Sequence, residues 1–204
     1  MTFTVAIDGP AASGKGTIAR AVAAEFGFRH LDTGLIYRAV GAKVAEGADP
    51  LEAAGNLSDA DLARPDLRGE ATGREASKVA ALPKVREILL QYQRDFAKSP
   101  EGAVLDGRDI GTVVCPDAQV KLFVTASDAV RAERRWAEEG GDASGRTLEM
   151  VLSALRDRDE RDRTRGTSPL VAAPDATVLD TSTMSVAEAI AEATAIIRAR
   201  MQQT

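Results

Sequence analysis

The chain has 204 residues and a formal net charge of −5, from 26 lysines and arginines against 31 aspartates and glutamates. This acidic balance argues against general attachment to nucleic acid or to an anionic membrane. The one cysteine, Cys115, excludes a disulfide framework, and no apolar run is long enough to span a membrane. We therefore expect a cytoplasmic protein with one domain, acting as a monomer.

The first predicted strand, residues 3–7, leads into a glycine-rich loop that precedes a helix predicted over residues 17–25. The loop residues are Gly9, Pro10, Ala11, Ala12, Ser13, Gly14, Lys15, Gly16 and Thr17. Glycine lets the backbone approach a ligand, so that successive N–H groups converge on phosphate oxygens. Lys15 adds a positive charge, and the N-terminus of the helix faces the same anion. Strand, loop and helix come in the order that a P-loop requires, which predicts a nucleotide phosphate site.

The residue after the lysine departs from the common P-loop, which has Ser or Thr at that place to hold Mg²⁺. Here Gly16 follows Lys15, and the hydroxyl comes one residue later at Thr17. We expect Mg²⁺ to keep more of its waters than in a GTPase, because the ion dehydrates reluctantly. Asp106 ends a buried strand and is a second candidate for contact with this water shell. The alternative for Asp106 is a helix cap or a structural acceptor.

Alternating strand and helix signals continue along the chain. A short strand over residues 28–31 is followed by Asp32 and Thr33, either of which can cap a helix through residues 36–40. From residue 47 to about 72 the periodicity fades, which predicts a loosely packed insertion with one short helix over 59–63. Helical periodicity returns from residue 77 to 96, and Pro83 leaves open whether this is two helices or one kinked helix.

The second half of the chain predicts three more strands, over residues 103–106, 119–124 and 177–180. The helices are predicted over 129–139, 148–163 and 186–201, with a glycine-rich, flexible break at 140–145. Strands separated by helical crossovers indicate a parallel sheet covered by helices, with ligands at the carboxyl ends of the strands. Asp32, Asp106, Arg108 and Asp109 would all project there, beside the phosphate loop.

Three further strings extend the motif set: LDTGLIYR at 31–38, DGRDIGTVV at 106–114 and RDERDRTR at 158–165. Together with the phosphate loop they resemble the bacterial cytidylate kinases, a family of P-loop nucleoside monophosphate kinases, over essentially the whole chain. The resemblance implies an α/β, three-layer P-loop kinase fold in which a parallel sheet is flanked by helices. It also implies transfer of a phosphoryl group from ATP to CMP or dCMP, with Mg²⁺.

The resemblance further implies a small NMP-binding appendage and a helical lid within a single domain spanning 1–204. The expected core covers 1–34, 76–126 and 166–204. The NMP-binding region covers 35–75 with part of 76–98, and the lid covers about 127–165. The segment between about 48 and 75 looks shorter than in relatives that carry a small extra sheet there.

Phosphoryl transfer between two anions is mostly a matter of positioning and charge neutralisation, for which arginine forks are suited. Arg38 and Arg108 are therefore candidates to hold the α-phosphate of the acceptor, and the alternative is that they are ordinary ion-pair arginines. By resemblance, the base is contacted by Thr33, Arg86, Asp109 and Arg165, and the sugar by Ser77, Arg158 and Asp162. Cytosine needs a donor toward N3 and an acceptor toward its amine, whereas uracil reverses both.

The polar helices after residue 128 have the pattern of exposed surface helices with weak ion pairs. Joined by a glycine-rich break, they also suit a hinged lid that excludes water. We expect one or two of Arg131, Arg134 and Arg161 to reach the transferred phosphoryl group, beside Lys15 and Arg108. His30 is expected to be a packed or edge residue and not a metal ligand, and Tyr37 and Trp136 are expected to be packing residues.

Two other functions remain open from the residues alone. A related kinase acting on UMP, AMP or a hydroxylated metabolite would share the architecture, although the DGRD and terminal arginine strings disfavour it. A nucleotide-dependent switch without turnover would share the phosphate loop. The chain lacks the Asn-Lys-x-Asp string by which such switches read guanine.

Overall fold

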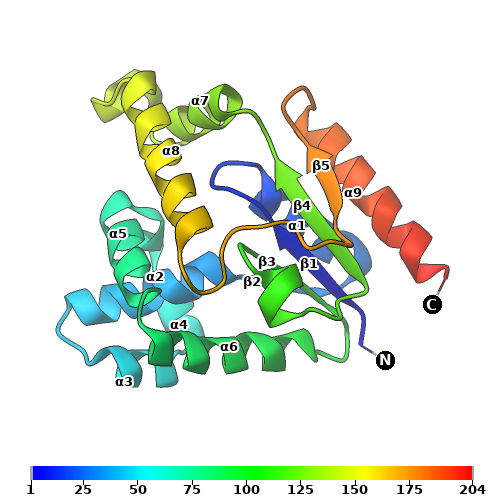
Figure 1. Cartoon of the computed structure of the whole chain (residues 1–204), viewed down its shortest axis with the longest axis horizontal. Helices are drawn as coiled ribbons and strands as arrows, with labels where there is room; N and C mark the ends of the chain where they lie inside the picture. The colour runs from blue at the N-terminus through cyan, green and yellow to red at the C-terminus, as the bar shows by residue number, and fades with distance from the viewer. Residues whose placement is uncertain (1, 204) are drawn as a thin grey trace.

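The structure is a computed structural model that describes residues 2–203, leaving aside the side chains of Asp59, Arg68 and Glu70. Its centre is a sheet of five parallel strands in the order β2-β3-β1-β4-β5 (Figure 1). The strands are β1 Thr4–Asp8, β2 Arg29–Asp32, β3 Ala103–Gly107, β4 Val120–Thr125 and β5 Thr177–Asp180. All five predicted strands are confirmed, with boundaries that differ by one residue at most.

Helices cover both faces of the sheet, which makes three layers (Figure 1). On one face, α1 Lys15–Phe26 and α9 Val186–Met201 pack on a core that includes Val5 and Ile7 of β1. On the other face, α2 Thr33–Ala45 and α6 Pro83–Ala97 pack on a core that includes Ala6. Alternate residues of the same strand thus serve opposite layers, as the two-residue repeat of a strand requires. The expected three-layer fold is confirmed.

The segment between α2 and α6 is more ordered than its sequence suggested. It forms α3 Pro50–Gly55, α4 Asp59–Leu62, a 3₁₀ turn η1 Pro65–Arg68 and α5 Glu70–Val79. Asp49 caps α3 by accepting hydrogen bonds from the backbone N–H groups of Leu51 and Glu52. The short helix predicted over 59–63 is confirmed as α4, but the expectation that it is the one helix of a loosely packed insertion is wrong.

Packing against α2 explains this order. Leu67 is completely buried beside Ala39 and Ala42 of α2. The crossing of α2 and α5 is close, because a Cβ at Gly41 would lie only 2.8 Å from the backbone nitrogen of Ala76. The alternative left open at Pro83 is also resolved: α5 ends at Val79, and Pro83 begins a separate helix, α6.

The segment that the resemblance implies is a lid, about 127–165, forms α7 Asp128–Glu138, a 3₁₀ turn η3 Gly141–Ser144 and α8 Leu148–Thr164. Ala132 of α7 and Val151 and Leu155 of α8 form a small apolar cluster with Ala11 of the P-loop. Trp136 packs against this cluster and donates a hydrogen bond to the backbone oxygen of Arg146 at 2.8 Å. The two helices thus lie over the carboxyl end of the sheet, above the phosphate loop (Figure 1).

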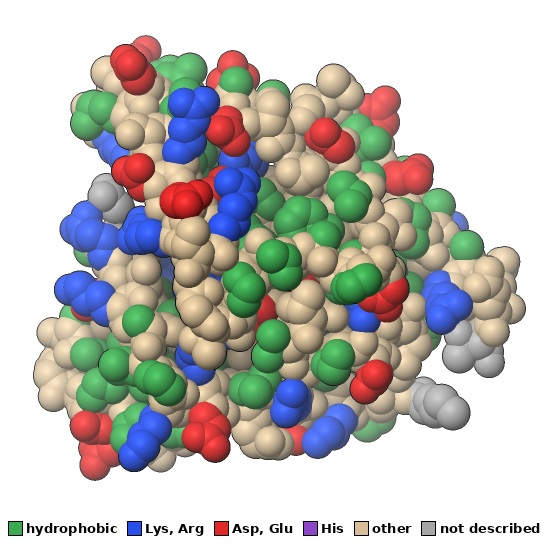
Figure 2. Space-filling model, viewed as in Figure 1, with side chains coloured by type: hydrophobic (Ala, Val, Ile, Leu, Met, Phe, Trp, Pro, Cys, Tyr) green, Lys and Arg blue, Asp and Glu red, His purple; other side chains and the backbone are tan. Residues whose placement is uncertain are grey.

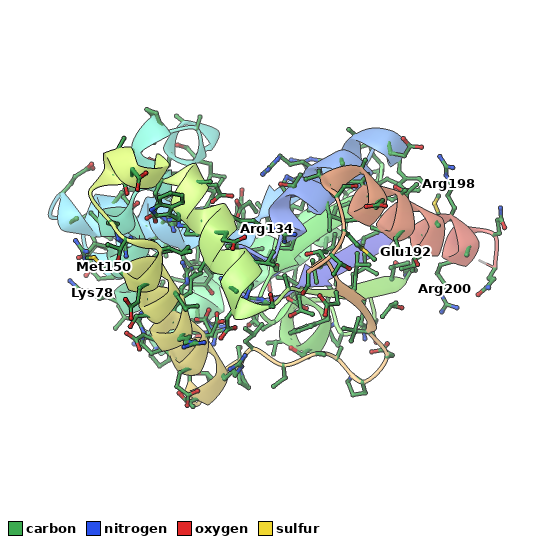
Figure 3. The ribbon with its side chains drawn as sticks, turned by 90° about the horizontal axis from the view of Figure 1, so that it is seen from above. Lys78, Arg134, Met150, Glu192, Arg198 and Arg200 are labelled. Atoms are coloured by element: carbon green, nitrogen blue, oxygen red, sulfur yellow. The ribbon has the colours of Figure 1, made fainter. Side chains whose placement is uncertain are left out.

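Seen from above, α8 and α5 lie at one end of the molecule, where Met150 and Lys78 are labelled (Figure 3). Glu192, Arg198 and Arg200 of α9 lie at the other end (Figure 3). No helix between residues 2 and 203 has both the length and the apolar character needed to cross a membrane.

Candidate active site

A cavity of about 760 Å³ opens at the carboxyl end of the sheet, between the P-loop, the NMP-binding region and the lid. Most of the residues expected in the site line it. These are Ala11, Ala12, Gly14, Lys15, Gly16, Thr17, Thr33, Arg38, Ser77, Arg86, Asp106, Arg108, Asp109, Arg158, Arg161, Asp162 and Arg165. Lys and Arg side chains gather on the side of the molecule where α8 lies (Figure 2). The cavity walls therefore carry a concentration of positive charge.

The P-loop takes its shape from glycines that no other residue could replace without strain. Gly9 has φ +152°, and a Cβ there would lie 2.0 Å from the backbone oxygen of Val124 on β4. Gly14 has φ +90° and caps α1, accepting hydrogen bonds at its carbonyl from the backbone N–H groups of Thr17 and Ile18. Gly9, Pro10 and Ser13 of the loop support it from behind and do not line the cavity.

Lys15 projects into the cavity and donates a hydrogen bond to the backbone oxygen of Pro10 at 3.3 Å. Burial, together with the positive charge of Arg108, lowers the pKa of Lys15 to about 7. The carboxylates of Asp106 and Asp32 act in the opposite direction. An anion bound beside this ammonium would restore its charge, because an opposite charge favours the protonated form of lysine.

The turn after β3 is held by a carboxylate from β1. The two oxygens of Asp8 accept hydrogen bonds from the backbone N–H groups of Ile110 at 2.8 Å and Gly111 at 2.7 Å. Asp8 is buried, and burial raises its pKa to about 6 in spite of these two bonds. The turn continues as a π-helix, η2 Ile110–Val114, which the sequence did not predict. Asp8 thereby fixes the backbone that carries Arg108 and Asp109.

Two predicted base-contact residues form an ion pair at the wall of the cavity. Arg86 of α6 lies 2.8 Å from Asp109, measured from Nη2 to Oδ2, and both side chains are nearly buried. The guanidinium carbon of Arg86 is 5.7 Å from the ring centroid of Tyr37. Tyr37 itself lines the cavity, and burial raises its pKa. Its place is therefore a wall of the site, and not only a packing position as expected.

A second ionic cluster joins the DGRD turn to α8. Asp162 accepts a hydrogen bond from Nε of Arg108 at 2.8 Å and lies within 4.0 Å of Arg158 and Arg165. Burial opposes ionisation of Asp162, but the three guanidinium groups, Arg108 foremost, hold its pKa below the usual value. Three positive charges face one negative charge here. The excess suits an anionic ligand such as a phosphate group.

Two other expected contacts are already engaged with the protein backbone. Nη1 of Arg38 donates to the backbone oxygens of Leu67 at 2.7 Å and Gly69 at 2.8 Å, so this side chain also anchors the NMP-binding region. The hydroxyl of Thr33 donates to the backbone oxygen of Asp106 at 2.8 Å. Arg38 and Thr33 both remain in the cavity wall, and Ser77 lines it from α5.

Arg131 differs from its expected position. It is 1% exposed, and its guanidinium binds the backbone oxygens of Ala126 and Ala11 and the carboxylates of Asp128 and Asp159. It does not line the cavity, so the structure does not place it at a transferred phosphoryl group. Helical spacing could not show this, because it does not distinguish an arginine that faces the loop from one that faces the cavity.

The other two lid arginines have different surroundings. Arg134 donates to the hydroxyl and backbone oxygen of Thr181 at 2.9 and 2.8 Å, and lies between the lid and the body of the molecule (Figure 3). Arg161 lines the cavity. Arg161 is therefore the lid arginine, of the three considered, that the structure brings to the site.

A family model described as cytidylate kinase matches residues 5–58 and 52–199 of the chain. The chain belongs to the cytidylate kinase family. It is 60% identical over 203 residues to the cytidylate kinase of Cereibacter sphaeroides (strain ATCC 17023), a match that covers 100% of this chain and 98% of the relative. It is 56% identical over 207 residues to the cytidylate kinase of Paramagnetospirillum magneticum, with 97% and 98% covered.

Solved structures with little sequence similarity share the fold. A gluconokinase from Sinorhizobium meliloti matches with a TM-score of 0.55 at 17% identity, over 98% of this chain and 95% of that one. The protein TT1252 from Thermus thermophilus matches with a TM-score of 0.54 at 20% identity, over 98% of both chains. These likenesses support the P-loop kinase fold, while the membership in the cytidylate kinase family is shown by the sequence relatives.

Two contacts that support the residues of this site were missed from the sequence. Asp8 has a signal that could have been used, since it is an acidic residue at the end of a buried strand, directly before the P-loop. His30 was expected to be a packed or edge residue, and it does lie on β2 at the edge of the sheet. In the structure its Nε2 lies 2.8 Å from Oδ1 of Asp106, the carboxylate at the end of β3.

Proposed function

We propose that this chain transfers the γ-phosphoryl group of ATP to CMP or dCMP, giving ADP and CDP or dCDP. One observation carries the proposal. The same cavity is lined by Lys15 of the P-loop and, on another wall, by the arginine cluster of Arg108, Arg158 and Arg165. Two anionic ligands can then meet there with their phosphates facing each other. Membership in the cytidylate kinase family supports this activity.

The donor side of the cavity is the P-loop. Backbone N–H groups at the start of α1 and the positive end of the helix dipole attract the β- and γ-phosphates of ATP. Lys15 contributes an ammonium that becomes fully charged once phosphate oxygens surround it, since its pKa in the empty cavity is about 7. The backbone oxygens of Ala11 and Ser13 already accept hydrogen bonds from Arg131 and Thr181, so this part of the loop is held before a nucleotide binds.

The acceptor side uses the arginines of the opposite wall. Arg108 and Arg38 hold the α-phosphate of CMP, because planar guanidinium groups bind phosphate oxygens in pairs. Arg158, Asp162 and Ser77 contact the sugar. The ion pair of Arg108 with Asp162 keeps the arginine oriented while the site is empty.

The base is read by the pair of Arg86 and Asp109 together with Thr33 and Arg165. A guanidinium donates to N3 of cytosine, and an oxygen acceptor receives the exocyclic amine. Uracil presents a donor and an acceptor at the opposite places, so both protein groups would lose their partners. Buried polar groups left without partners produce discrimination of about 10⁴-fold in sites of this kind.

The donor set near the P-loop fits Mg²⁺. Thr17 and Asp106 offer oxygen atoms at the cavity wall, and Mg²⁺ is held by one or two carboxylates while phosphates and waters complete its shell. Among the described residues no group of three or more His, Cys, Asp or Glu side chains is placed to cage an ion. When bound, the ion neutralises charge on the β- and γ-phosphates.

The transfer itself needs alignment and charge more than proton chemistry. The attacking atom is an anionic phosphate oxygen of CMP, so no strong general base is required. Lys15 and Arg108 neutralise charge from the two walls, and Arg161 of α8 supplies charge from the lid side. Arg131 acts indirectly, because it holds the carbonyl of Ala11 in the P-loop and touches no substrate. All these residues come from one chain, so the proposed site does not need a residue from a second copy.

Initial rates with ATP and Mg²⁺ against CMP, dCMP, UMP and AMP test the proposal. We expect ADP release to depend on CMP or dCMP and to exceed the rate with UMP or AMP at equal concentration. A nucleotide switch would bind ATP but show no rate increase with CMP. A kinase for another metabolite would be inactive with both cytidine nucleotides, and either outcome would refute the proposed function.

A further inference from the structure

His30 of β2 and Asp106 of β3 point to the same face of the sheet. The two strands pair in parallel with His30 opposite Val104 and Asp32 opposite Asp106. Side chains alternate along a strand, so residues two apart share a face. The imidazole therefore crosses diagonally to the neighbouring strand, and its Nε2 reaches Oδ1 of Asp106 at 2.8 Å.

The chemistry of the two groups gives this hydrogen bond its direction. An ionised carboxylate can only accept, so Nε2 of His30 carries the hydrogen and donates it. The side chains are 19% and 4% exposed. A hydrogen bond to a charged acceptor in such surroundings is stronger than the same bond in water.

The contacts of Asp106 leave one oxygen available to the cavity. Its backbone oxygen accepts the hydroxyl of Thr33, which fixes the main chain at this point. The carboxylate can still turn about χ2, a torsion with broad energy wells. His30 holds Oδ1, whereas Oδ2 lies toward α1, 3.7 Å from the place of a Cβ on Gly16.

The side chain of His30 does not line the cavity. Asp106 lines the cavity from inside, and His30 is not among the lining residues. The histidine therefore stands behind the carboxylate as seen from the substrates. It can influence them through the orientation of Asp106 and not by direct contact.

We propose that His30 is a positioning residue for the phosphoryl transfer. Its Nε2–H holds Oδ1 of Asp106, so that Oδ2 is presented to the water shell of the Mg²⁺ carried by ATP. This inference rests on the proposed function, since it needs a metal–nucleotide complex beside Asp106. Partners of this kind, which orient a metal-facing carboxylate, change metal affinity about 10- to 100-fold when they are removed.

The test measures metal affinity without turnover. Mn²⁺ is titrated into the complex of enzyme and ADP, and free Mn²⁺ is read from its electron paramagnetic resonance signal. His30→Leu should weaken Mn²⁺ binding by about tenfold, because it removes the donor. His30→Gln should stay within about threefold of the wild type, since its amide nitrogen falls where Nε2 lies. Binding of CMP, measured by calorimetry, should be the same in all three proteins.

Arg29→Met is the matched control on the same strand. Arg29 lies over the ring of Phe96 and donates to Ser99, away from Asp106, so its loss should leave Mn²⁺ affinity unchanged. If His30→Leu does not fold, His30→Asn takes its place, because the shorter amide cannot reach Oδ1. Equal Mn²⁺ affinity in the wild type and the variant without the donor would overturn the inference, as would an equal loss in the Gln variant.

Asp106→Asn separates a failure of this inference from a failure of the proposed function. If Asp106→Asn weakens Mn²⁺ binding and His30→Leu does not, only the role of His30 is refuted. If neither variant weakens it, Asp106 does not face the metal, and the inference falls together with that part of the proposed function. Phosphoryl transfer to CMP by the wild-type enzyme reports separately on whether the activity itself is correct.

Discussion

Arg131 of α7 and Asp159 of α8 form a buried ion pair, with 2.6 Å between Nη2 and Oδ2. The same guanidinium donates to the backbone oxygen of Ala11 in the P-loop at 3.1 Å. One side chain thus joins both lid helices to the phosphate loop. The other oxygen of Asp159 has no hydrogen-bond partner within residues 2–203, so this carboxylate depends on Arg131 for its compensation.

Replacing Arg131 by Met should destabilise the protein by about 3–5 kcal/mol, because it leaves the buried carboxylate of Asp159 unpaired. The measurement is the free energy of unfolding from urea denaturation at pH 7.5. The double variant Arg131→Met with Asp159→Leu should recover most of this loss, since neither charge then remains. A stable Arg131→Met protein that has lost only its transfer rate would instead place Arg131 at the phosphoryl group.

Nucleotide binding should take up protons near neutral pH through Lys15. Its pKa in the free enzyme is about 7 because of burial and Arg108, and nearby phosphates raise it. Nucleotide binding should therefore take up about half a proton at pH 7 and more at pH 8. Because binding takes up protons, the contribution of Lys15 to nucleotide affinity grows as the pH falls from 8 to 6. Calorimetric titration with ADP in two buffers of different ionisation enthalpy measures the uptake.

Lys15→Arg is the control for this prediction, because a guanidinium stays charged throughout this pH range. The difference in proton uptake between the wild type and Lys15→Arg isolates the lysine from the titration of the nucleotide itself. An identical uptake in the two proteins would show that Lys15 is already charged in the free enzyme.

Lys15→Ala should fold normally and lose phosphoryl transfer.

Arg86→Met should lower the preference for CMP over UMP, measured as the ratio of their kcat/KM values. In the proposed site Arg86 donates toward N3 of cytosine, and its loss would also free Asp109 from its ion pair. We expect kcat/KM for CMP to fall about 100-fold and that for UMP to change much less, since uracil already lacks the matching groups. Lys84→Met, an exposed change on the same helix, should leave the ratio unchanged. An unaltered preference in Arg86→Met would mean that the base is read elsewhere.

Asp8 should give the folded protein a specific pH dependence. Its folded pKa of about 6 lies above the ordinary value of 3.8, so the folded state binds a proton more tightly than the unfolded state between these values. Relative to Asp8→Asn, the wild type should therefore gain stability as the pH falls from 7 to 4, and lose that gain as the pH rises through 6. Urea unfolding of both proteins at several pH values measures this difference. If the free energies of unfolding of the wild type and Asp8→Asn changed with pH in the same way, the pKa assigned to Asp8 would be contradicted.

The sequence predicted those parts of the fold and site that depend on local pattern. The strand before Gly9 and the helix after Lys15 belong to one continuous stretch of sequence, so their local patterns predict both. The alternation of strands and helices along the chain predicted the parallel sheet. The arginines of the DGRD and terminal strings were placed through a family resemblance that the comparisons confirm. Their individual contacts with a nucleotide remain predictions.

What the sequence did not predict depends on contacts between distant segments. Leu67 orders the NMP-binding region only because α2 offers it a pocket beside Ala39 and Ala42. The bonds from Ile110 and Gly111 to Asp8 join residues more than one hundred positions apart. The register between β2 and β3 places His30 and Asp106 on the same face of the sheet. No local sequence pattern predicts this register.

The contact between Gly9 and Val124 has a consequence for protein engineering. Even the smallest side chain at position 9 would collide with the backbone oxygen of Val124, since its Cβ would stand 2.0 Å away. A flexible side chain could swing aside, but the backbone of β4, which is paired with a strand on each side, cannot. Random libraries built on this scaffold should therefore keep the glycine codon at position 9 fixed and direct diversity to other sites.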